Sequence, residues 1–198
     1  FLYLSMRRHL LILPLCLWFT IASAVNLDSL WGVWNDPAQA DTARLKAIKK
    51  IAWDGYLFSQ PDSAFYFAQV QYDFASSVGN KKWMASALII QGVIFYVQGN
   101  YEQALSYYKK SLNIWKEVGD KEGISASLDN IGVIYLLQGN YEEALNYYKK
   151  SLKIDKETGD KIGIASSLAN IGLLYDNQSN FQKALTYFLE ALSISKEI

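Results

Sequence analysis

The sequence predicts an all-α fold in which antiparallel helical hairpins stack into a solenoid. Residues 101–120 and 141–160 are identical at 15 of 20 positions, and residues 121–140 match residues 161–180 at 11 of 20. Apolar residues recur within each repeat at spacings of three and four, which is typical of amphipathic helices. Gly-Asn or Gly-Asp pairs break this pattern between helices. A fixed period of 40 residues indicates a stacked array rather than one globular core, and such arrays mostly provide binding surfaces.

The composition excludes several kinds of active site. The chain has 198 residues, with 19 basic and 19 acidic side chains, one His and one Cys. His9 and Cys16 both precede Ala24, so the rest of the chain has no imidazole or thiol for a zinc site, a nucleophile, a catalytic triad or a disulfide. The charge is balanced and forms no basic block, which argues against nucleic acid as a partner. The composition does not exclude an active site built only from carboxylates or lysines, but no spacing in the sequence indicates one. We therefore expect no catalytic residue, no metal and no cofactor.

The first 24 residues have the order of a secretory signal peptide. A cationic start at Met6–His9 precedes an apolar run at Leu10–Ile21 and a small-residue site that ends at Ala24. The apolar run is shorter than the roughly 20 residues that span a bilayer. We therefore expect cleavage and an exported protein, with retention as an anchor as the alternative. Residues 1–5 precede the first Met and are expected to be an extension of the gene model.

The unit at residues 121–160 illustrates the predicted hairpin. Asp120 is expected to cap the first helix, and Asn140 with Glu143 to form a capping box for the second. Gly159 fits a left-handed cap at the end of the second helix. Helices that approach closely need small residues at the contact and aromatic residues beside it. The predicted packing residues of this unit are Gly132, Tyr135, Ala144 and Tyr148.

This unit resembles the tetratricopeptide repeat. The family pattern is a large apolar residue, then Leu-Gly, Tyr, Gly, Tyr, Ala, an aromatic and a small residue. These places are Leu128, Ile131-Gly132, Tyr135, Gly139, Tyr141, Ala144, Tyr148 and Ser151. The neighbouring units carry the same small packing residues, Gly92 and Ala104 before it and Gly172 and Ala184 after it. The resemblance implies a right-handed superhelical solenoid, and the period of 40 rather than about 34 resembles the longer repeats of kinesin light chains.

The pattern divides the chain into segments. A leader at 25–43 contains two Trp without clear periodicity and is expected to pack over the first unit. A degenerate first hairpin at 44–80 follows, in which Pro61 suits the first turn of a helix. The last repeat stops before its Gly-Asp turn, so we expect an array that is cut short at Ile198. The complete division is 1–24, 25–43, 44–80, 81–120, 121–160 and 161–198.

The resemblance also implies where a ligand lies, because the first helices of such units line a concave wall. Asn130 and Asn170 are equivalent residues one period apart, and in the longer-repeat branch this Asn often holds the backbone of an extended peptide. An amide side chain both donates and accepts, as a peptide backbone does. The alternative is that both amides hydrogen-bond the neighbouring hairpin. The other predicted wall residues are Ile90, which stands in the place of the Asn, and Val93, Asp129, Val133, Leu137, Leu173 and Asn177.

Two functions fit these observations. The first is a non-catalytic, exported scaffold that binds a protein or peptide segment, or another part of the same protein. The second is the sensory input region of a larger bacterial signalling protein, since repeats after a signal peptide resemble the periplasmic halves of such proteins. In that case a histidine kinase, nucleotide cyclase or transcription regulator domain, and any membrane segment, would follow residue 198.

Overall fold

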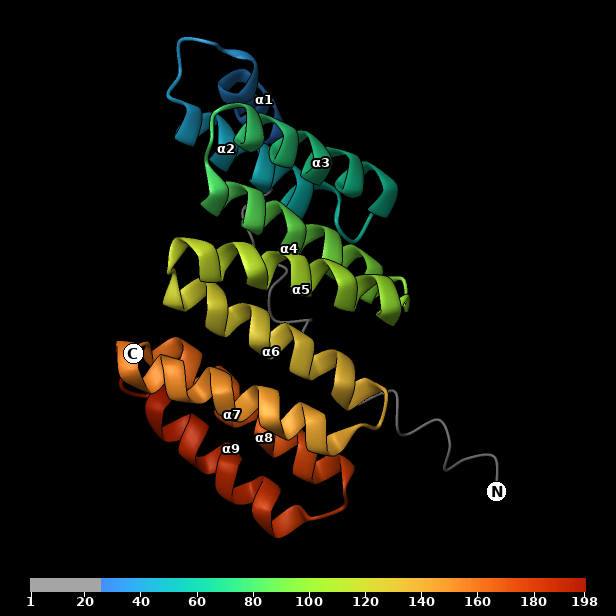
Figure 1. The fold of residues 1–198 in the computed structure, drawn as a ribbon, viewed down its shortest axis with the longest axis vertical. Helices are drawn as coiled ribbons and strands as arrows, with labels where there is room; N and C mark the ends of the chain where they lie inside the picture. The colour runs from blue at the N-terminus through green and yellow to red at the C-terminus, as the bar shows by residue number, and fades with distance from the viewer. Residues whose placement is uncertain (1–25) are drawn as a thin grey trace.

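The computed structural model describes residues 26–198 as a stack of helices, and the predicted all-α solenoid is confirmed. Figure 1 shows the hairpins in chain order along the longest axis, from α1 at one end to α9 at the other. The predicted signal peptide lies outside the described residues. The elements are α1 (Leu27–Asn35), α2 (Asp41–Lys50), the π-helical η2 (Ile51–Tyr56), α3 (Pro61–Ser77), α4 (Lys81–Val97), α5 (Tyr101–Val118), α6 (Lys121–Leu137), α7 (Tyr141–Thr158), α8 (Lys161–Asn177) and α9 (Phe181–Ser195).

The helices pair as antiparallel hairpins, and the pairs curve around one side. The most extensive contacts join α4 to α5, α6 to α7 and α8 to α9, and each second helix then packs on the first helix of the next hairpin. The first helix α6 also lies against the first helix α8, whereas no second helix contacts another over a comparable length in the described chain. The first helices therefore form the inner, concave side of the stack. None of the helices in residues 26–198 combines the length and apolarity needed to cross a membrane.

The turns follow the predicted chemistry with one exception. Gly159 has a φ of 74°, in the left-handed region, and the glycines of the other turns share this conformation. The predicted capping box at Asn140 is not formed, because its side chain makes no hydrogen bond to the start of α7. The Asp and Asn residues before the neighbouring helices do cap them. These bonds run from the amides of Trp83, Gln103, Gly123, Ile162 and Lys183 to Asn80, Asn100, Asp120, Asp160 and Asn180.

The turn between α8 and α9 contains a residue, Ser179, whose backbone conformation is strained, and its replacement tests this strain. Ser179 has a φ of 59°, where Gly99 and Gly139 stand in the equivalent turns. A side chain is disfavoured in this conformation and glycine is not. We expect Ser179→Gly to raise the free energy of unfolding by about 0.5–1 kcal/mol. Urea denaturation measures this change, and Ser179→Ala is the control because alanine keeps the strain. An equal gain in both variants would contradict the assignment of the strain to φ.

The same packing contact recurs in each regular hairpin. The glycine in the first helix faces an aromatic ring on the second helix, and a small alanine lies beside it with almost no exposed surface. A Cβ atom on these glycines would lie less than 3 Å from a ring carbon. The two helices can therefore approach only because no side chain separates them. The glycine and aromatic pairs are Gly92 with Tyr108, Gly132 with Tyr148, and Gly172 with Phe188, and the alanines are Ala104, Ala144 and Ala184.

Two further contacts repeat with the same period. Tyr135 on α6 stacks on Tyr147 of α7, with ring centroids 5.4 Å apart and planes inclined by 15°. Equivalent stacks join Phe95 to Tyr107 and Tyr175 to Tyr187. An exposed ion pair also joins the first residue of each first helix to a glutamate at or just beyond the C-terminal end of the second helix of the same hairpin. Its members are Lys81 and Glu117, Lys121 and Glu157, and Lys161 and Glu197.

The N-terminal leader forms a helix that the sequence pattern did not predict. The Trp31 ring in α1 packs edge-on against Phe67 of α3, with centroids 5.2 Å apart. Arg44 of α2 donates from Nε to the carbonyl oxygen of Trp34, and its guanidinium lies over the rings of Trp34 and Phe74. These contacts hold α1 across α2 and α3. Helix α1 is too short for its apolar residues to recur over several turns, so its sequence shows no clear periodicity.

Candidate functional site

Apolar side chains are exposed along the concave side of the stack. Val97 at the end of α4 and Leu137 at the end of α6 are equivalent residues, and each keeps more than two-fifths of its surface exposed. Leu173 of α8 is 45% exposed, and Tyr96 contributes a half-exposed ring on α4. Val97 and Leu137 are in register on successive first helices, and Leu173 lies one turn earlier on α8, where Asn177 takes the equivalent place, so these side chains form an apolar strip with a polar residue at its C-terminal end. Such a strip is suited to contact with another protein segment.

Asn130 and Asn170 lie half-buried on α6 and α8, the first helices of their hairpins. Among the described residues, neither amide side chain hydrogen-bonds another protein group, although both are well placed in the register of the repeat. The alternative expectation, a bond from each amide to the neighbouring hairpin, is therefore not observed. Each amide retains two donors and an acceptor. The pair offers the polar counterpart to the apolar strip.

The structure places the other predicted wall residues at different depths. Ile90 is only 1% exposed and packs in the core with Ala52 and Ala68, so it offers a ligand little more than the floor of a hollow. A β-branched apolar residue gains more by burial between hairpins than by lining an open wall. Val93 and Val133 are half-buried and pack against the cores of their hairpins. Asn177 is exposed and donates to the carbonyl oxygen of Leu173 on its own helix.

Asp129 faces the junction between hairpins as well as the concave side. Its two carboxylate oxygens lie 3.1 and 3.2 Å from Ser167 Oγ on α8. Burial raises the pKa of the Asp129 carboxyl to about 7, the hydroxyls of Ser151 and Ser167 oppose this by hydrogen bonding, and the charge of Asp155 adds to it. Sequence reasoning assigned Asp129 to the ligand and missed its partners. The signal was present, because Asp155 replaces Trp115 in otherwise nearly identical blocks.

A hollow at the N-terminal end of the concave side was also not predicted. It has a volume of about 380 Å³ and lies between η2 and α4. Trp53 lines it with 38% of its surface exposed, beside Ile89 and Ser86. Lys49 and Lys50 flank this opening. The degenerate repeat pattern in residues 44–80 hid Trp53 and the two lysines, because it gave no register from which to predict the residues that face the concave side.

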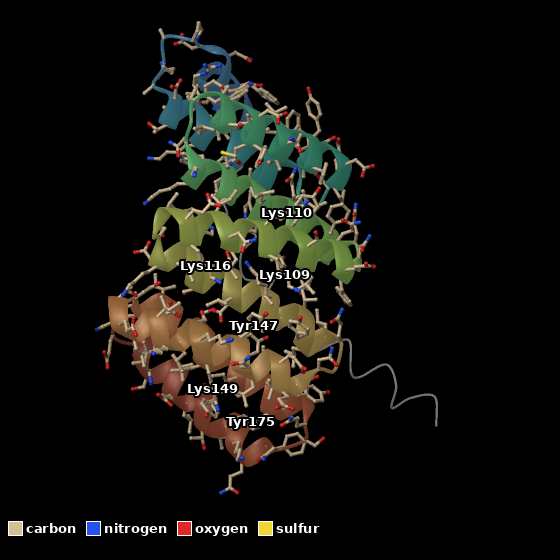
Figure 2. All side chains as sticks on the ribbon, viewed as in Figure 1. Lys109, Lys110, Lys116, Tyr147, Lys149 and Tyr175 are labelled. Carbon is tan, nitrogen blue, oxygen red and sulfur yellow. The ribbon has the colours of Figure 1, made fainter. Side chains whose placement is uncertain are left out.

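The outer side of the stack differs in character. Figure 2 labels Lys109, Lys110 and Lys116 on α5 and Lys149 on α7, and all four are exposed. The ammonium group of Lys110 lies 5.0 Å from the centroid of the Tyr107 ring, and Lys150 repeats this contact with Tyr147. These lysines therefore cover the aromatic stacks with their charged ends in solvent, as expected for amphipathic side chains. The outer side thus exposes charged side chains of both signs, whereas the first helices expose apolar side chains near two amides.

The arrangement of metal-ligand groups and tyrosine hydroxyls bears on the chemistry of the concave side. Within residues 26–198, no three His, Cys, Asp or Glu side chains are grouped closely enough to hold a metal ion. Burial raises the pKa of the hydroxyls of Tyr108 and Tyr148, which keeps both neutral as packing residues. Hydrogen bonding and apolar contact are what the concave side can provide.

Comparisons with known proteins identify this architecture. A family model described as tetratricopeptide repeat matches residues 83–157 and 137–197, which together span more than half of the chain. A comparison with curated proteins finds no match.

Solved structures share the fold at low sequence identity. BtubC (BKLC) from P. vanneervenii is 19% identical with a TM-score of 0.65, over 86% of this chain and 70% of that one. A STAND signal-transduction ATPase with a tetratricopeptide repeat sensor, from Pyrococcus horikoshii, is 24% identical with a TM-score of 0.66, over 80% of this chain and 25% of that one. A putative kinesin light chain with TPR-like repeats from Podosopora anserina is 13% identical with a TM-score of 0.61, over 86% and 84%.

The family model agrees with two features of the structure. These are the contact between a glycine and an aromatic ring in each regular hairpin, and the repetition of the hairpins every 40 residues. This chain belongs to the tetratricopeptide repeat family.

Proposed function

We propose that the concave side of this protein binds an extended segment of a partner protein and that the chain acts as a non-catalytic scaffold. The observation that carries this proposal is the pair of half-buried amides, Asn130 and Asn170, which are free of protein partners within residues 26–198. A backbone amide and carbonyl of a bound peptide would satisfy each side chain. Membership of a family whose proteins bind protein or peptide partners supports the same reading.

The surroundings of the two amides favour a segment with apolar side chains. Leu137 and Leu173 are both nearly half exposed and lie one helix turn or two beyond the amides. A bound segment that covers them would remove apolar surface from water, at about 25 cal/mol per Å². The amides would fix the backbone while the leucines accept alternate side chains. The hollow beside Trp53 extends the same surface toward the N-terminal end.

Removal of both amides tests this proposal. Peptides of twelve residues, selected from a random displayed library on the wild-type protein, serve as the probes. We expect Asn130→Ala with Asn170→Ala to weaken their binding by about 1–3 kcal/mol, or roughly 5–150-fold, because peptide groups are left unpaired. Isothermal titration calorimetry on the purified proteins measures the affinity, and circular dichroism checks that the variant remains folded.

Asn146→Ala is the matched control, because Asn146 is an exposed amide on the outer helix α7. The control should bind the selected peptides as the wild type does. If the double variant also retains full affinity, the concave amides do not hold the peptide. If selection yields only peptides that lose affinity in the Asn146 control, the binding surface lies on the outer side.

The second candidate function is sensory input to a larger signalling protein. Its support is the structural similarity to an array that is described as a sensor in a signal-transduction ATPase, of which this chain covers 25%. In that case the bound segment would belong to a partner or to an output domain of the same protein. Sequencing the gene beyond the codon for residue 198 distinguishes the two, because a membrane span and a catalytic domain there would favour the sensor.

Export is also proposed, and the order of charges and apolar residues in residues 1–24 supports it. A fusion of these residues to alkaline phosphatase, which is active only after export, tests this directly. An inactive fusion would contradict it.

A further inference from the structure

One inter-hairpin junction contains a cluster of buried polar side chains that the proposed function does not use. We call it the Ser-Asp cluster, and it lies where α6, α7 and α8 meet. Its carboxylates are half-buried Asp129 on α6 and Asp155 on α7, which is only 1% exposed. Three almost fully buried hydroxyls connect them. These are Ser125 on α6, Ser151 on α7 and Ser167 on α8.

Ser167 is the residue that joins the two carboxylates. Its Oγ lies 3.1 Å from Asp129 Oδ1 and 3.2 Å from Asp155 Oδ2. A serine hydroxyl has one proton, so Ser167 can donate to only one of these carboxylates. The remaining contact is a repulsion between oxygen lone pairs unless the other carboxyl carries a proton.

The other two hydroxyls, those of Ser125 and Ser151, already have hydrogen-bond partners. Ser125 Oγ donates to Asp155 Oδ1. Ser151 Oγ lies 3.0 Å from the carbonyl oxygen of Ser125, and 3.4 Å from Asp155 Oδ2. The shorter bond reaches a carbonyl on α6, the other helix of the same hairpin. Every short contact is then satisfied if Asp129 is protonated and donates to Ser167, which donates to Asp155. One carboxyl proton therefore completes the network.

No cation relieves the two carboxylates within the described residues. The lysines that begin α6 and α8, Lys121 and Lys161, pair with Glu157 and Glu197. The titratable groups that face the cluster are Tyr148 on α7 and Asp160 at the start of α8, and the negative charge of Asp160 acts on Asp155. Two nearby carboxylates without a counter-ion share a proton rather than both ionise. Burial accordingly raises the pKa of both Asp129 and Asp155.

The preceding junction shows the same architecture without the acids. One period earlier, the positions of Ser125, Asp129 and Asp155 are occupied by Ala85, Ile89 and Trp115. The serine-to-carbonyl bond is retained there, since Ser111 Oγ donates to the carbonyl oxygen of Ala85 at 2.9 Å. The glycine that accommodates the side chain is retained as well, because Gly123 lies against Trp115 and Gly163 against Asp155. The three differences therefore converge in space on one junction.

We propose that a single carboxyl proton, held by Asp129 in the Ser-Asp cluster near neutral pH, keeps α8 seated against α6 and α7, and that its loss at higher pH loosens this junction. With both carboxylates ionised, Ser167 on α8 can donate to only one of them, so one of its two contacts to the hairpin of α6 and α7 becomes repulsive and α8 is held less firmly. Asp129 lies next to Asn130, so the spacing of the first helices on the concave side would change with pH. The proposal does not depend on what that side binds.

Hydrogen exchange at individual amides of the full chain, followed by NMR at pH 6 and pH 8.5, tests the proposal. After correction for the intrinsic exchange rate, we expect the protection of α8 to fall about tenfold at the higher pH. The protection of α4, which lies outside this junction, should stay constant. The carboxyl carbon of Asp129, observed in the same samples, should titrate near pH 7.

Two variants make the outcome decisive. Asp129→Asn carries a permanent donor to Ser167 and should abolish the pH dependence of α8 protection. The triple variant Ser125→Ala, Asp129→Ile, Asp155→Trp copies the preceding junction and should do the same. Glu143→Gln, which removes an exposed carboxylate from α7, is the control and should behave as the wild type. Equal pH dependence in the wild type and Asp129→Asn, or a carboxyl of Asp129 that titrates near pH 4, would overturn the proposal.

Discussion

Replacement of Gly132 by leucine is expected to lower the free energy of unfolding by about 3 kcal/mol, because it overpacks the contact between α6 and α7. Even a Cβ atom at this position would lie 2.6 Å from Cε1 of Tyr148. The Tyr148 side chain is fully buried, so its ring has no free space into which it can move. The helices must therefore separate, and the core they share with α8 is exposed. Gly132→Ala should show a smaller loss of the same sign.

Urea denaturation followed by circular dichroism measures this loss. Gly32→Ala is the control, because Gly32 is helical and a Cβ there would meet nothing within 4 Å. Alanine at that site should stabilise the protein by up to about 1 kcal/mol through helix propensity. A second check combines Gly132→Ala with Tyr148→Leu. The leucine side chain is smaller than the tyrosine ring and should leave room for the added methyl group, which removes most of the stability loss caused by Gly132→Ala. An unchanged midpoint for Gly132→Leu would refute the packing role.

Raising the pH from 5 to 8 is expected to lower the free energy of unfolding by roughly 2 kcal/mol, mainly through Asp129. Its pKa rises from the usual value of 3.8 for an aspartate carboxyl to about 7 in the folded protein. Between these values the folded state binds more protons than the unfolded state, so stability is greatest below the unfolded pKa and is lost as the pH rises through 7. The expected loss of stability is based on about 1.4 kcal/mol for each unit by which the pKa is shifted within this pH range. It is then reduced because Asp129 is only half-buried.

Chemical denaturation at a series of pH values measures the effect, and Asp129→Asn should remove it. The difference between the two profiles cancels the contributions of other titrating groups. Carboxylates with lowered pKa values, such as Asp36 and Asp120, lose their stabilising effect only in acid below this range. A wild-type profile that is flat or rises between pH 5 and pH 8 would contradict the assignment. This global measurement is separate from the local opening of α8.

The regular part of the fold was predictable from residue spacing. The turns contain glycines with positive φ, the first helices are capped by Asp or Asn, and Gly132 lies against Tyr148, because each of these features depends on residues close in sequence or within one hairpin. Asn140 is the exception among the caps, since an Asn at the right position does not determine its rotamer. Helix α1 and η2 were not predicted. Their register depends on contacts such as Trp31 with Phe67, which are distant in sequence.

The candidate site was predictable only in outline. The register of the repeat predicts which residues of α6 and α8 face the concave side, and Asn130 and Asn170 are half-buried on these helices. It could not indicate depth, so Ile90 was assigned to the wall although it belongs to the core. Nor could it show that Asp129 is engaged by Ser167, because 38 residues separate them and only the stacking of hairpins brings them together.

The sequence by itself determined the hairpin, its period and the family, because these follow from local periodicity and from small and aromatic residues that recur every 40 positions. The tertiary structure alone decided how neighbouring repeats differ. Trp115 and Asp155 occupy the same place in two repeats, yet one completes an apolar contact with Gly123 and the other a buried network with Ser125 and Ser167. The reason is physical. A buried carboxylate is stable only where partners from three helices converge, and that convergence exists only after the hairpins have stacked.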